Sequence, residues 1–585
     1  MNRLETMNQP GHLRTQGPSR LLVAVAGLLL AVVFVLVNPH FNGDAPFYAA
    51  SLADSGRPTW MPGHALWEPV AFMFIRAAAA IGIQLDTLLA MQIISAVATA
   101  ALVVVTYDFA RRMGLTCRSA LGGAALLAFT ANSLVMGGGG YAATSLSLAT
   151  MIAARALVRL DGEPWRIGDG AIAVTALALG WGAWGVAVLA YPAIFVVAAI
   201  GSSGTPLRRM ARGGALVVTA GLVTLILAAA IWRGPADATD LGLLAWLDSA
   251  SHSIVFVPPD LADFLRPGLG VIRAFVELGS LGFSLKAALL GDNAHIAVWE
   301  ALRWSVVLLF VGALFGRAIV GLGRRIYSGD PLAQRFGLLA IVSLAPTYLF
   351  SIVYGGTEYH MHSTALPFVC IALALGLDGF RPVRLGPIPS TAGVGALAVL
   401  VGAINLIGTC LPDLRSDGGF PMALARKAAR QLPPKSLLVV TGQDFRGSVI
   451  GVVTYHARVK VLNVANEVDY YGTEAWQPRM QSAMAASIDS GGQIAVLSDF
   501  VGIPTPGGLK LSEREHPVPS FAEVASALNG WTHVCTWNVE GYSFVTIAPP
   551  GTDPPTTCTG DGASMTSGAG AVNRVLQPET GGLRP

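Results

Sequence analysis

The stretch "LLVAVAGLLLAVVFVLVNPHFNGDAPFY", Leu21–Tyr48, decides the fold class of this chain. Residues 21–37 contain no charged side chain. A helix needs about 20 apolar residues to cross a bilayer. The run is longer than the apolar part of most signal peptides, and no clear small-residue cleavage site follows it. It therefore predicts a retained first span, followed by a loop in which acidic residues begin at Asp44.

The rest of the chain has the same apolar character. Of its 585 residues, 53% are hydrophobic and 12% are charged, and the mean hydropathy is +0.57. Soluble domains carry roughly 25% charged residues. The composition predicts an α-helical polytopic membrane protein. A formal net charge of +3 does not indicate a nucleic-acid partner.

The distribution of apolar stretches and arginines predicts the topology. About eleven spans fit within residues 21–410. The short loops at 136–141 and 355–363 contain no Lys or Arg, whereas the loops alternating with them are rich in Arg. This pattern predicts a cytoplasmic N-terminus, residues 1–20, in a cell membrane. The candidate spans are 21–38, 86–107, 119–135, 142–158, 171–186, 187–201, 214–232, 304–322, 336–354, 364–379 and 391–410.

Two of the predicted outer loops are long, at 38–85 and 233–303. The second half of the first loop, "PVAFMFIRAAAAIGI", is short for a span and contains Pro and Arg. A helix lying along the outer interface fits this segment better. The second long loop contains apolar pieces, such as "LGSLGFSLKAALLG", and is expected to pack back over the outer face of the bundle.

Beyond the last span, the pattern changes to that of a small α/β domain at 411–550, on the outer, periplasmic side. The segments "SLLVVTG", "VKVLNVAN" and "QIAVLSDF" predict short buried strands, and residues 531–550 predict a hairpin. Helical patterns lie between the strands. Residues 551–585 are rich in Pro, Gly, Ser and Thr and are predicted to be disordered. Cys535 and Cys558 would pair in an oxidising compartment.

Asp44, in "FNGDAPFY", has two compatible interpretations. The first is a helix N-cap, because Asp accepts bonds from the first free N–H groups and Pro46 suits a first turn. The second is a general base at the membrane surface. An apolar wall would raise the pKa of the carboxyl group towards a useful range.

His64 and Glu68 lie in "MPGHALWEPV", residues 61–70, beside Trp67. One interpretation is an ordinary turn at headgroup level. The alternative is that His64 binds a phosphate or a substrate hydroxyl. The prolines and glycine of this segment make it rigid, which favours a shaped site.

A third cluster, in "GGTEYHMHSTALP", contains Glu358, His360 and His362. One carboxylate and two imidazoles could hold a divalent metal. Phosphate binding by the histidines at a helix start is an alternative, and interfacial side chains are another. The other outer cations that could contact a phosphate, a lipid headgroup or the interface are Arg57, Arg273 and Arg303.

The segment "GDAPFYAASLADSGRPTWMPGHALWEPVAFMFIRAAAAIG", Gly43–Gly82, resembles the first outer loop of GT-C-fold glycosyltransferases. That group includes protein O-mannosyltransferases and aminoarabinose transferases of lipid A. Gly43-Asp44 matches the acidic motif of the group, and Tyr48 matches its aromatic residue. The segment "PGHALWEP" is a rearranged form of the His-Pro part.

The resemblance continues along the membrane part. "LLAFTANSLVMGGGGYAATSLSLATMIAARALVR" resembles the third and fourth spans of the group, which are joined by a tight outer turn. The acidic residue that often follows this turn is replaced by "GGGGYAATS", a departure that weakens any metal site using it. "EYHMHSTALPFVCIALALGL" resembles the segment that opens a late span.

The resemblance implies transfer of a sugar from a polyprenyl-phosphate donor to an acceptor hydroxyl at the outer face. It further implies inversion at the anomeric carbon, with Asp44 as general base. A divalent metal is the one cofactor considered, and the sugar and acceptor stay open. The residues expected to bind substrate are Tyr48, Arg57, His64, Glu68, Arg303, His360 and His362.

Chemistry at this surface requires the first loop to fold back against the bundle. We expect Asp44 to face a cleft lined by His64 and the 355–363 turn, partly covered by the 233–303 loop.

Two other functions are considered. A transporter or flippase is disfavoured, because the spans are nearly free of ionisable residues. A non-catalytic scaffold would need neither a shaped first loop nor the long second one.

Overall fold

The structure, a computed structural model, describes residues 20–37, 44–159, 163–236, 242–248, 261–277, 298–354, 358–378, 391–411, 419–442, 445, 448–503 and 519–551. By its contacts the chain divides into two compact units. The helical unit comprises Met1–Asn42, Thr59–Leu247 and Pro258–Arg415, and the sheet unit comprises Gly43–Pro58, Asp248–Val257 and Ser416–Pro585. The predicted tail at 552–585 lies outside the described residues.

Each candidate span falls on a helix or on two consecutive helical segments. The described helices of the helical unit are α1 (Arg20–Val37), α3 (Trp67–Ala80), α4 (Thr87–Arg112), α5 (Cys117–Phe129), α6 (Ala143–Ala156), α7 (Ile167–Ala183), α8 (Tyr191–Ile200), α9 (Pro206–Arg233), α10 (Leu243–Asp248), α11 (Leu261–Phe275), α13 (Val298–Tyr327), α14 (Pro331–Val353), α15 (Leu366–Asp378) and α16 (Thr391–Asn405). Four described segments are long and apolar enough to cross a membrane: Thr87–Arg112, Pro206–Arg233, Pro331–Val353 and Gly393–Cys410. The total of eleven stays a prediction.

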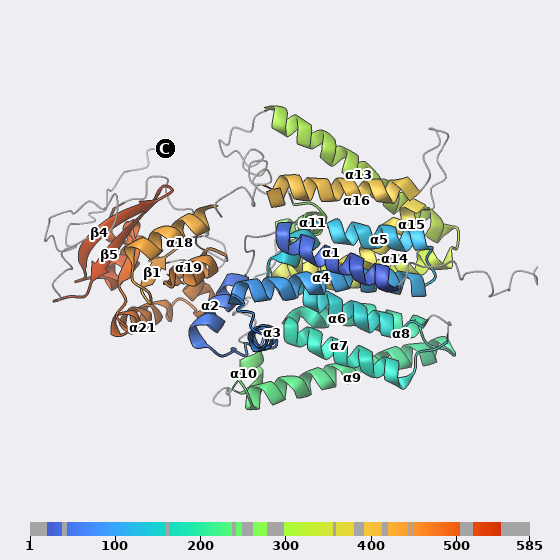
Figure 1. The fold of residues 1–585 in the computed structure, drawn as a ribbon, viewed down its shortest axis with the longest axis horizontal. Helices are drawn as coiled ribbons and strands as arrows, with labels where there is room; N and C mark the ends of the chain where they lie inside the picture. Colours follow the sequence, from blue (N-terminus) through green and yellow to red (C-terminus); the bar gives the residue numbers. More distant parts are fainter. Residues whose placement is uncertain are drawn as a thin grey trace, which may run out of the picture. The chain divides into compact units, whose positions relative to one another are not determined.

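These helices lie side by side as a bundle, as Figure 1 shows for α4, α6, α7 and α9. Small residues allow the backbones to approach closely. At Gly376 of α15, an added Cβ would lie 2.0 Å from the carbonyl oxygen of Ala318 in α13. The apolar helix α3 lies in the segment expected to follow the outer interface.

Several helices are interrupted at the same end of the bundle. The chain leaves α7 at Trp184, whose φ of −154° is extended, and continues as the 3-10 helix η2 (Gly185–Ala190) into α8. Residues 171–201 are therefore two segments rather than one long helix. Two π-helices, η1 (Asn132–Met136) and η5 (Leu406–Cys410), contact each other after α5 and α16. Such π-helical turns occur frequently at functional sites.

The side chain of Asn405 ties this region together. It is fully buried at the end of α16. Its amide nitrogen donates to the carbonyl oxygens of Phe129 and Phe275, both at 2.8 Å. Its amide oxygen accepts the backbone N–H of Glu277 at 2.9 Å. One side chain thus joins the ends of α5, α11 and α16.

The sheet unit contains five strands in the order β2-β1-β3-β5-β4. They are β1 (Leu437–Val440), β2 (Lys460–Asn463), β3 (Ile494–Leu497), β4 (Thr532–Val539) and β5 (Tyr542–Ala548). The first three are parallel, and β3–β5 and β5–β4 are antiparallel. All lie within the segments predicted as strands or hairpin. The two-residue turn at Glu540-Gly541 has φ of 45° and 88°, which closes the hairpin.

The helices of this unit are α2 (Ala45–Ser55), α18 (Gly419–Gln431), α19 (Ser448–Ala457), α20 (Val464–Tyr471), α21 (Trp476–Asp489) and α22 (Phe521–Ala527). The central strands β1 and β3 are buried along their whole length, as expected for a parallel sheet with covered faces. One boundary differs from the sequence prediction. Gly43–Pro58, assigned there to a loop of the membrane domain, groups with the sheet unit.

Candidate active site

Asp44 is the residue directly before α2, with Pro46 in the first turn of that helix. It occupies the N-cap position, as the first interpretation requires, but its side chain accepts no capping hydrogen bond. Its backbone carbonyl accepts the N–H of Tyr48 at 3.1 Å. The carboxylate is therefore not engaged by the N–H groups of its own helix. This geometry is compatible with the second interpretation, a general base.

The position of α2 is set by α19. An added Cβ at Gly451 in α19 would lie 2.8 Å from the backbone nitrogen of Phe47 and 3.2 Å from the Cβ of Pro46. The first turn of α2 thus packs against the α19 backbone where a side chain is missing. Further along, the Arg458 guanidinium pairs with the Asp54 carboxylate at 2.8 Å. The helix that begins after Asp44 is held by the sheet unit at both ends.

Tyr48 and Arg57 also belong to this part of the chain. Tyr48 is one turn after Asp44 and is 5% exposed. Its ring packs edge-on against that of Phe47, with centroids 5.8 Å apart. Arg57 follows α2 and is exposed, and its backbone N–H donates to the Ser55 hydroxyl at 3.3 Å. The structure therefore places Tyr48 in the packing around α2 and leaves the Arg57 side chain at the surface.

His64 is fastened to the break between α7 and η2. Its Nδ1 lies 3.1 Å from the carbonyl oxygen of Ala183. A carbonyl only accepts, so Nδ1 carries the proton and Nε2 is the nitrogen that changes protonation. The backbone on both sides is bonded to the same place, by Gly185 N–H to the Gly63 carbonyl at 2.8 Å and Leu66 N–H to the Gly182 carbonyl at 2.6 Å. The second half of the first loop thus folds onto the bundle.

Glu68 supports this loop from inside. It is 2% exposed and lies in the first turn of α3. Its Oε2 accepts the backbone N–H of Thr59 at 2.8 Å. A buried carboxylate at a helix N-terminus is stabilised by such N–H donors and by the helix dipole. We interpret Glu68 as a residue that shapes the loop, while its predicted contact with substrate is not tested by this geometry.

Four rings from four distant segments meet beside His64. This ring cluster consists of His64, Tyr141, Trp184 and His360. The His64 ring is stacked with that of Trp184 at 6.4 Å, with an interplanar angle of 8°. The Trp184 ring contacts that of His360 at 5.3 Å and that of Tyr141 at 5.9 Å. The Tyr141 and His360 rings are 5.2 Å apart. The cluster combines apolar ring faces with two imidazoles.

The sequence interpretation did not single out Tyr141 and Trp184. Tyr141 follows the glycine run 137–140, and Trp184 lies in "GWGAWG" at the α7 break. A tryptophan flanked by glycines inside an apolar segment is the signal that could have identified the break. The structure brings His64 and His360 into one cluster, across about 300 residues of chain.

His360 is one of the ionisable members of the late turn η4 (Tyr359–His362). Its side chain is 12% exposed, and its Nδ1 lies 3.3 Å from the Glu358 carboxylate. Desolvation by itself raises the pKa of Glu358. The hydrogen bond and charge of His360 and the charge of Arg273 outweigh it, so the net pKa is lowered. Glu358 therefore stays ionised beside the His360 ring.

His362 points elsewhere and is fully buried. Its Nδ1 lies 3.1 Å from the Thr347 hydroxyl, which itself donates to the Leu344 carbonyl. The imidazole therefore donates from Nδ1 to that hydroxyl oxygen. Burial, followed by the charge of His360, lowers the pKa of His362 to about 4. This neutral, enclosed imidazole supports the turn, and its contact with substrate stays a prediction.

The structure gives the third cluster as a 3-10 turn that begins after Glu358. The Glu358 carboxylate and the His360 Nδ1 are 3.3 Å apart, whereas the His362 imidazole is turned to the Thr347 hydroxyl. No three His, Cys, Asp or Glu side chains are grouped as metal ligands in the part of the chain that the structure describes. A metal held by Glu358, His360 and His362 stays a prediction.

Helix α11, from the second long loop, packs beside η4 and α14. The Tyr348 hydroxyl of α14 donates to the Phe264 carbonyl at 2.7 Å. At the other end of α11, the Arg273 guanidinium pairs with Glu277 at 2.7 Å. A described part of this loop thus packs over the histidine turn. The side chain of Arg303, in α13, and residues 278–297 lie outside the described part of the structure.

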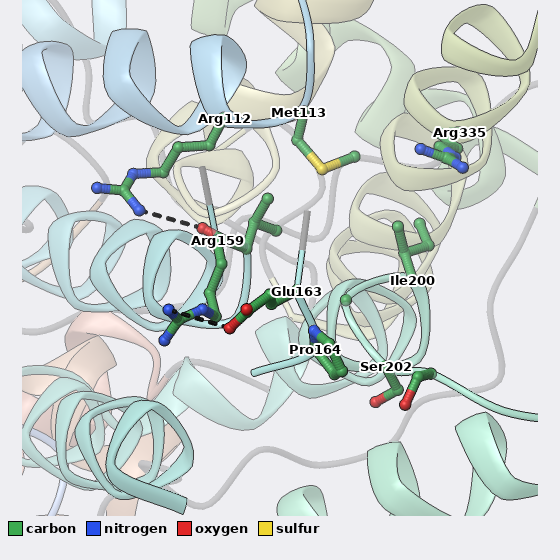
Figure 2. Close-up of a pocket in the computed structure, with 11 residues that line it drawn as sticks. Arg112, Met113, Arg159, Glu163, Pro164, Ile200, Ser202 and Arg335 are labelled. Carbon is green, nitrogen blue, oxygen red and sulfur yellow. Dashed lines mark hydrogen bonds and ion pairs between the residues drawn. The ribbon is translucent and has the colours of Figure 1, made fainter. Parts of the chain in front are cut away.

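The opposite ends of α6 and α7 have a different chemistry. Helix α6 runs from Ala143, beside Tyr141, to Ala156, and α7 returns from Ile167 to the break at Trp184. A cavity of about 220 Å³ lies there. Figure 2 shows Arg112, Arg159 and Arg335 around it, with Glu163 and Ser202. We call this cavity the arginine pocket.

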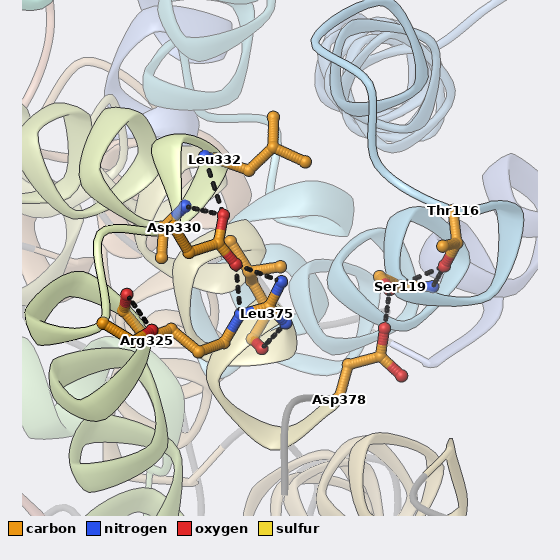
Figure 3. Close-up of polar contacts among 9 residues, drawn as sticks. Thr116, Ser119, Arg325, Asp330, Leu332, Leu375 and Asp378 are labelled. Carbon is orange, nitrogen blue, oxygen red and sulfur yellow. Dashed lines mark hydrogen bonds and ion pairs between the residues drawn. The ribbon is translucent and has the colours of Figure 1, made fainter. Parts of the chain in front are cut away.

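Charged groups near this end also tie helices together, as Figure 3 shows. Between α13 and α14, Arg325 pairs with Asp330 at 2.6 Å and donates to the Leu375 carbonyl at 3.1 Å. Asp330 also accepts the N–H of Leu332 at 2.9 Å, which caps α14. The Ser119 hydroxyl of α5 donates to Asp378 at the end of α15. These bonds are structural.

The bundle and its interrupted outer-loop elements define the class of fold, that of GT-C membrane glycosyltransferases. ArnT, the aminoarabinose transferase of Cupriavidus metallidurans, matches in its apo crystal structure over 90% of this chain and 97% of its own, with a TM-score of 0.55 and 13% identity. Its structure bound to undecaprenyl phosphate matches over the same shares, with a TM-score of 0.52 and 13% identity.

An oligosaccharyltransferase of Archaeoglobus fulgidus, crystallised with zinc and sulfate, matches over 91% of this chain and 74% of its own, with a TM-score of 0.46 and 12% identity. No protein-family model matches the chain, and no curated protein matches it in sequence. The predicted fold relationship is confirmed by the ArnT likeness. At this level of identity, the likeness concerns the fold.

Proposed function

We propose that this protein is an integral-membrane glycosyltransferase that transfers a sugar from a polyprenyl-phosphate carrier to an acceptor hydroxyl. The observation that carries the proposal is the likeness to ArnT over 90% of the chain, including a structure of that protein bound to undecaprenyl phosphate. Two features of this chain support it. An aspartate stands at the start of α2, and a ring cluster contains two imidazoles.

In the proposed reaction, the Asp44 carboxylate accepts the proton of the acceptor hydroxyl. The acceptor oxygen attacks the anomeric carbon from the face opposite the phosphate. The bond between that carbon and the phosphate oxygen breaks, and polyprenyl phosphate leaves with the bonding electron pair. The configuration at the anomeric carbon is inverted. No oxidant, reductant or metal is required for this balance.

The ring cluster offers side chains suited to the leaving phosphate and to the sugar ring or lipid. A developing phosphate charge is stabilised by positioned donors in a site that excludes water. His360, whose Nδ1 lies 3.3 Å from Glu358, and His64, held through Nδ1 by the Ala183 carbonyl, are the described candidates for such donors. The faces of Trp184 and Tyr141 offer apolar area for a sugar ring or the first prenyl unit. Arg57 and Arg303 stay candidate cations.

The topology forms part of the proposal. The N-terminus is cytoplasmic, about eleven helices span the membrane, and the sheet unit lies outside, in the periplasm. The arginine distribution supports this orientation. Cys535 in β4 is disulfide-bonded, which supports an oxidising compartment for the sheet unit. Its predicted partner Cys558 lies outside the described residues. Cys117, Cys370 and Cys410 are not disulfide-bonded.

The test is donor consumption by the full-length protein in nanodiscs. A panel of undecaprenyl-phosphate sugars is added together with an envelope extract as the source of acceptors. Mass spectrometry follows the release of undecaprenyl phosphate and the gain of one sugar by an acceptor. Release that requires both protein and extract supports the proposal. A protein that moves intact donor between leaflets and leaves every sugar attached would be a flippase, and the proposal would fail.

A further inference from the structure

The sheet unit contains a topological switch point, which the proposed reaction does not use. Its strand order begins β2-β1-β3, and these three strands are parallel. The chain therefore passes from β1 to a strand on one side of it, and then crosses to a strand on the other side. In open α/β sheets, ligands bind outside the carboxyl ends of the strands at such a point.

Two hydroxyl side chains lie at this point. Thr441 directly follows β1, and Ser498 directly follows β3. Val439 pairs with Val496, so each hydroxyl residue is two positions beyond that pair, on neighbouring strands. Such strands are about 4.8 Å apart, which keeps the two residues close. Both residues are 1% exposed or less, and neither hydroxyl has a hydrogen-bond partner among the residues that the structure describes.

The opposite ends of the same strands are different. Ser436, directly before β1, is also buried, but its hydroxyl donates to the Pro433 carbonyl at 2.6 Å and accepts the Gln493 N–H at 2.8 Å. The Ser487 hydroxyl donates to the Lys435 carbonyl at 2.9 Å. Burying a hydroxyl without a partner costs free energy, so native proteins satisfy most of them. The pair at the carboxyl edge is an exception, which a ligand with hydrogen-bonding groups would resolve.

Aromatic rings lie at the same carboxyl edge. Phe445, in the loop after β1, is fully buried, and its ring centroid is 5.0 Å from that of Tyr542. Tyr542 begins β5, two residues beyond the Leu497–Phe544 pair, so it lies at the carboxyl end of β3. Its ring centroid is also 4.9 Å from that of Phe420, and both residues are half-buried. The edge thus combines partly exposed rings with buried hydroxyls.

Asn463, the last residue of β2, fixes the loop after β1. It is 2% exposed, and its amide nitrogen donates to the carbonyl oxygens of Gly442 and Phe445, both at 3.1 Å. Its amide oxygen accepts the N–H of Ala465 at 3.0 Å, which caps α20. The described part of the edge is therefore held by the protein's own hydrogen bonds, as in a preformed site.

The chemistry of the edge defines its ligand. A hydroxyl both donates and accepts, so the two buried hydroxyls match the hydroxyls of a neutral ligand. Aromatic rings offer apolar area to the face of a sugar. The charged residue next to Ser498 is Asp499, and an acid disfavours an anionic ligand.

We infer that the carboxyl edge of β1 and β3 binds one sugar unit of a neutral saccharide. The site consists of other residues than those proposed for transfer, and its binding does not require that reaction. Residues 443, 444, 446 and 447 lie outside the described part of the structure and are not assigned to the site.

The experiment uses the full-length protein in nanodiscs and measures binding, so transferase activity is not needed. Saturation-transfer NMR is used to titrate glucose, galactose, mannose and arabinose, each added singly. The thermal midpoint without sugar reports the stability of each variant. The test variants are Thr441→Val and Ser498→Ala, which remove the two hydroxyls. The control is Ser436→Ala, which removes an engaged hydroxyl at the other end of β1.

We expect at least one sugar to bind the wild type and Ser436→Ala with equal affinity. Thr441→Val and Ser498→Ala should each weaken that affinity roughly two- to tenfold, the usual effect of losing one hydrogen bond. Because their hydroxyls have no described partner to lose, these two variants should keep or raise the thermal midpoint. Ser436→Ala should lower it, since the Gln493 N–H loses its acceptor.

The inference is overturned if no sugar in the panel binds, or if both test variants bind as the wild type does. It is also overturned if the test variants lower the midpoint as far as Ser436→Ala does, because internal water would then engage the hydroxyls and their role would be structural. A protein that binds sugar at this edge without transferring it contradicts only the transfer proposal.

Discussion

The two halves of the loop between α1 and α4 differ in what holds them. In the first half, the helix after Asp44 packs on α19 at Gly451 and pairs with Arg458. In the second half, the segment around His64 is hydrogen-bonded to the α7 break. One continuous loop thus belongs to two compact units.

This difference bears on the proposed reaction. The proposed base is carried by the sheet unit, and the proposed phosphate donors, His64 and His360, are carried by the helical unit. A reaction needing both would depend on how the two units are arranged. Substitutions in the two halves of the loop should then reduce the rate of transfer in different ways.

The strongest test of the first half is Asp44→Asn. The amide cannot accept the acceptor proton, so we expect transfer to fall by about 10²–10⁴-fold, the usual contribution of a general base. Donor binding should change little. The measurement is the rate of undecaprenyl phosphate release, and the control is Asp489→Asn, an exposed aspartate at the end of α21. Equal rates for Asp44→Asn and the wild type would mean that Asp44 is only the residue at which the helix begins and is not the base.

The docking of α2 is tested next, by Gly451→Ala. The added methyl would approach the Phe47 nitrogen to 2.8 Å, so the first turn of α2 must shift by a fraction of an ångström. Small displacements of a catalytic group have large effects on rate, and we expect transfer to fall roughly ten- to a hundredfold with the fold retained. Gly316→Ala, where an added Cβ has nothing within 4 Å, is the control. Loss of folding with unchanged specific activity would refute this positioning role.

The second half is tested by His360→Gln. The substitution removes one hydrogen-bond donor to the leaving phosphate. We therefore expect the rate of undecaprenyl phosphate release to fall roughly tenfold or more. The control is His456→Gln, an exposed histidine of α19. If both variants keep the wild-type rate of undecaprenyl phosphate release, the ring cluster is packing and the phosphate donors lie elsewhere.

The smallest effect on activity is expected at His362, which should influence stability instead. Its pKa is about 4 in the folded protein against 6.5 ordinarily, so the unfolded state binds a proton first. Stability should fall as pH decreases through 6.5 towards 4, by on the order of 3 kcal/mol. Glu358 contributes at lower pH. Its pKa is lowered in the folded protein, so the stabilisation from its charge is lost as the pH falls below the ordinary pKa of a glutamate.

The measurement is the thermal midpoint in detergent as a function of pH, for the wild type and His362→Gln. The variant should show a flatter dependence between pH 6.5 and 4.5, although its midpoint at neutral pH is reduced. An unchanged slope would mean that His362 is not the group whose protonation destabilises the turn.

Much of the fold could be predicted because its signals are local. Apolar runs of span length correspond to helices, and strand segments such as "SLLVVTG" correspond to strands of the sheet. The α7 break was left open by hydropathy, since Trp184 and its neighbours are apolar on both sides. The glycine at 451 gave no indication of its role, because the contact it permits is with a helix 400 residues earlier in the chain.

By itself, the sequence determined the membrane class, the places of the helices and strands, and the residues Asp44, His64 and His360 as candidates. These follow from composition and short-range periodicity. Only the tertiary structure decided that His64 and His360 share a cluster with Tyr141 and Trp184. It alone turned His362 towards Thr347 and away from the Glu358–His360 pair, because a 3-10 turn and a strand give the same spacing different directions. Side-chain direction depends on the backbone conformation, and spacing along the chain does not specify it.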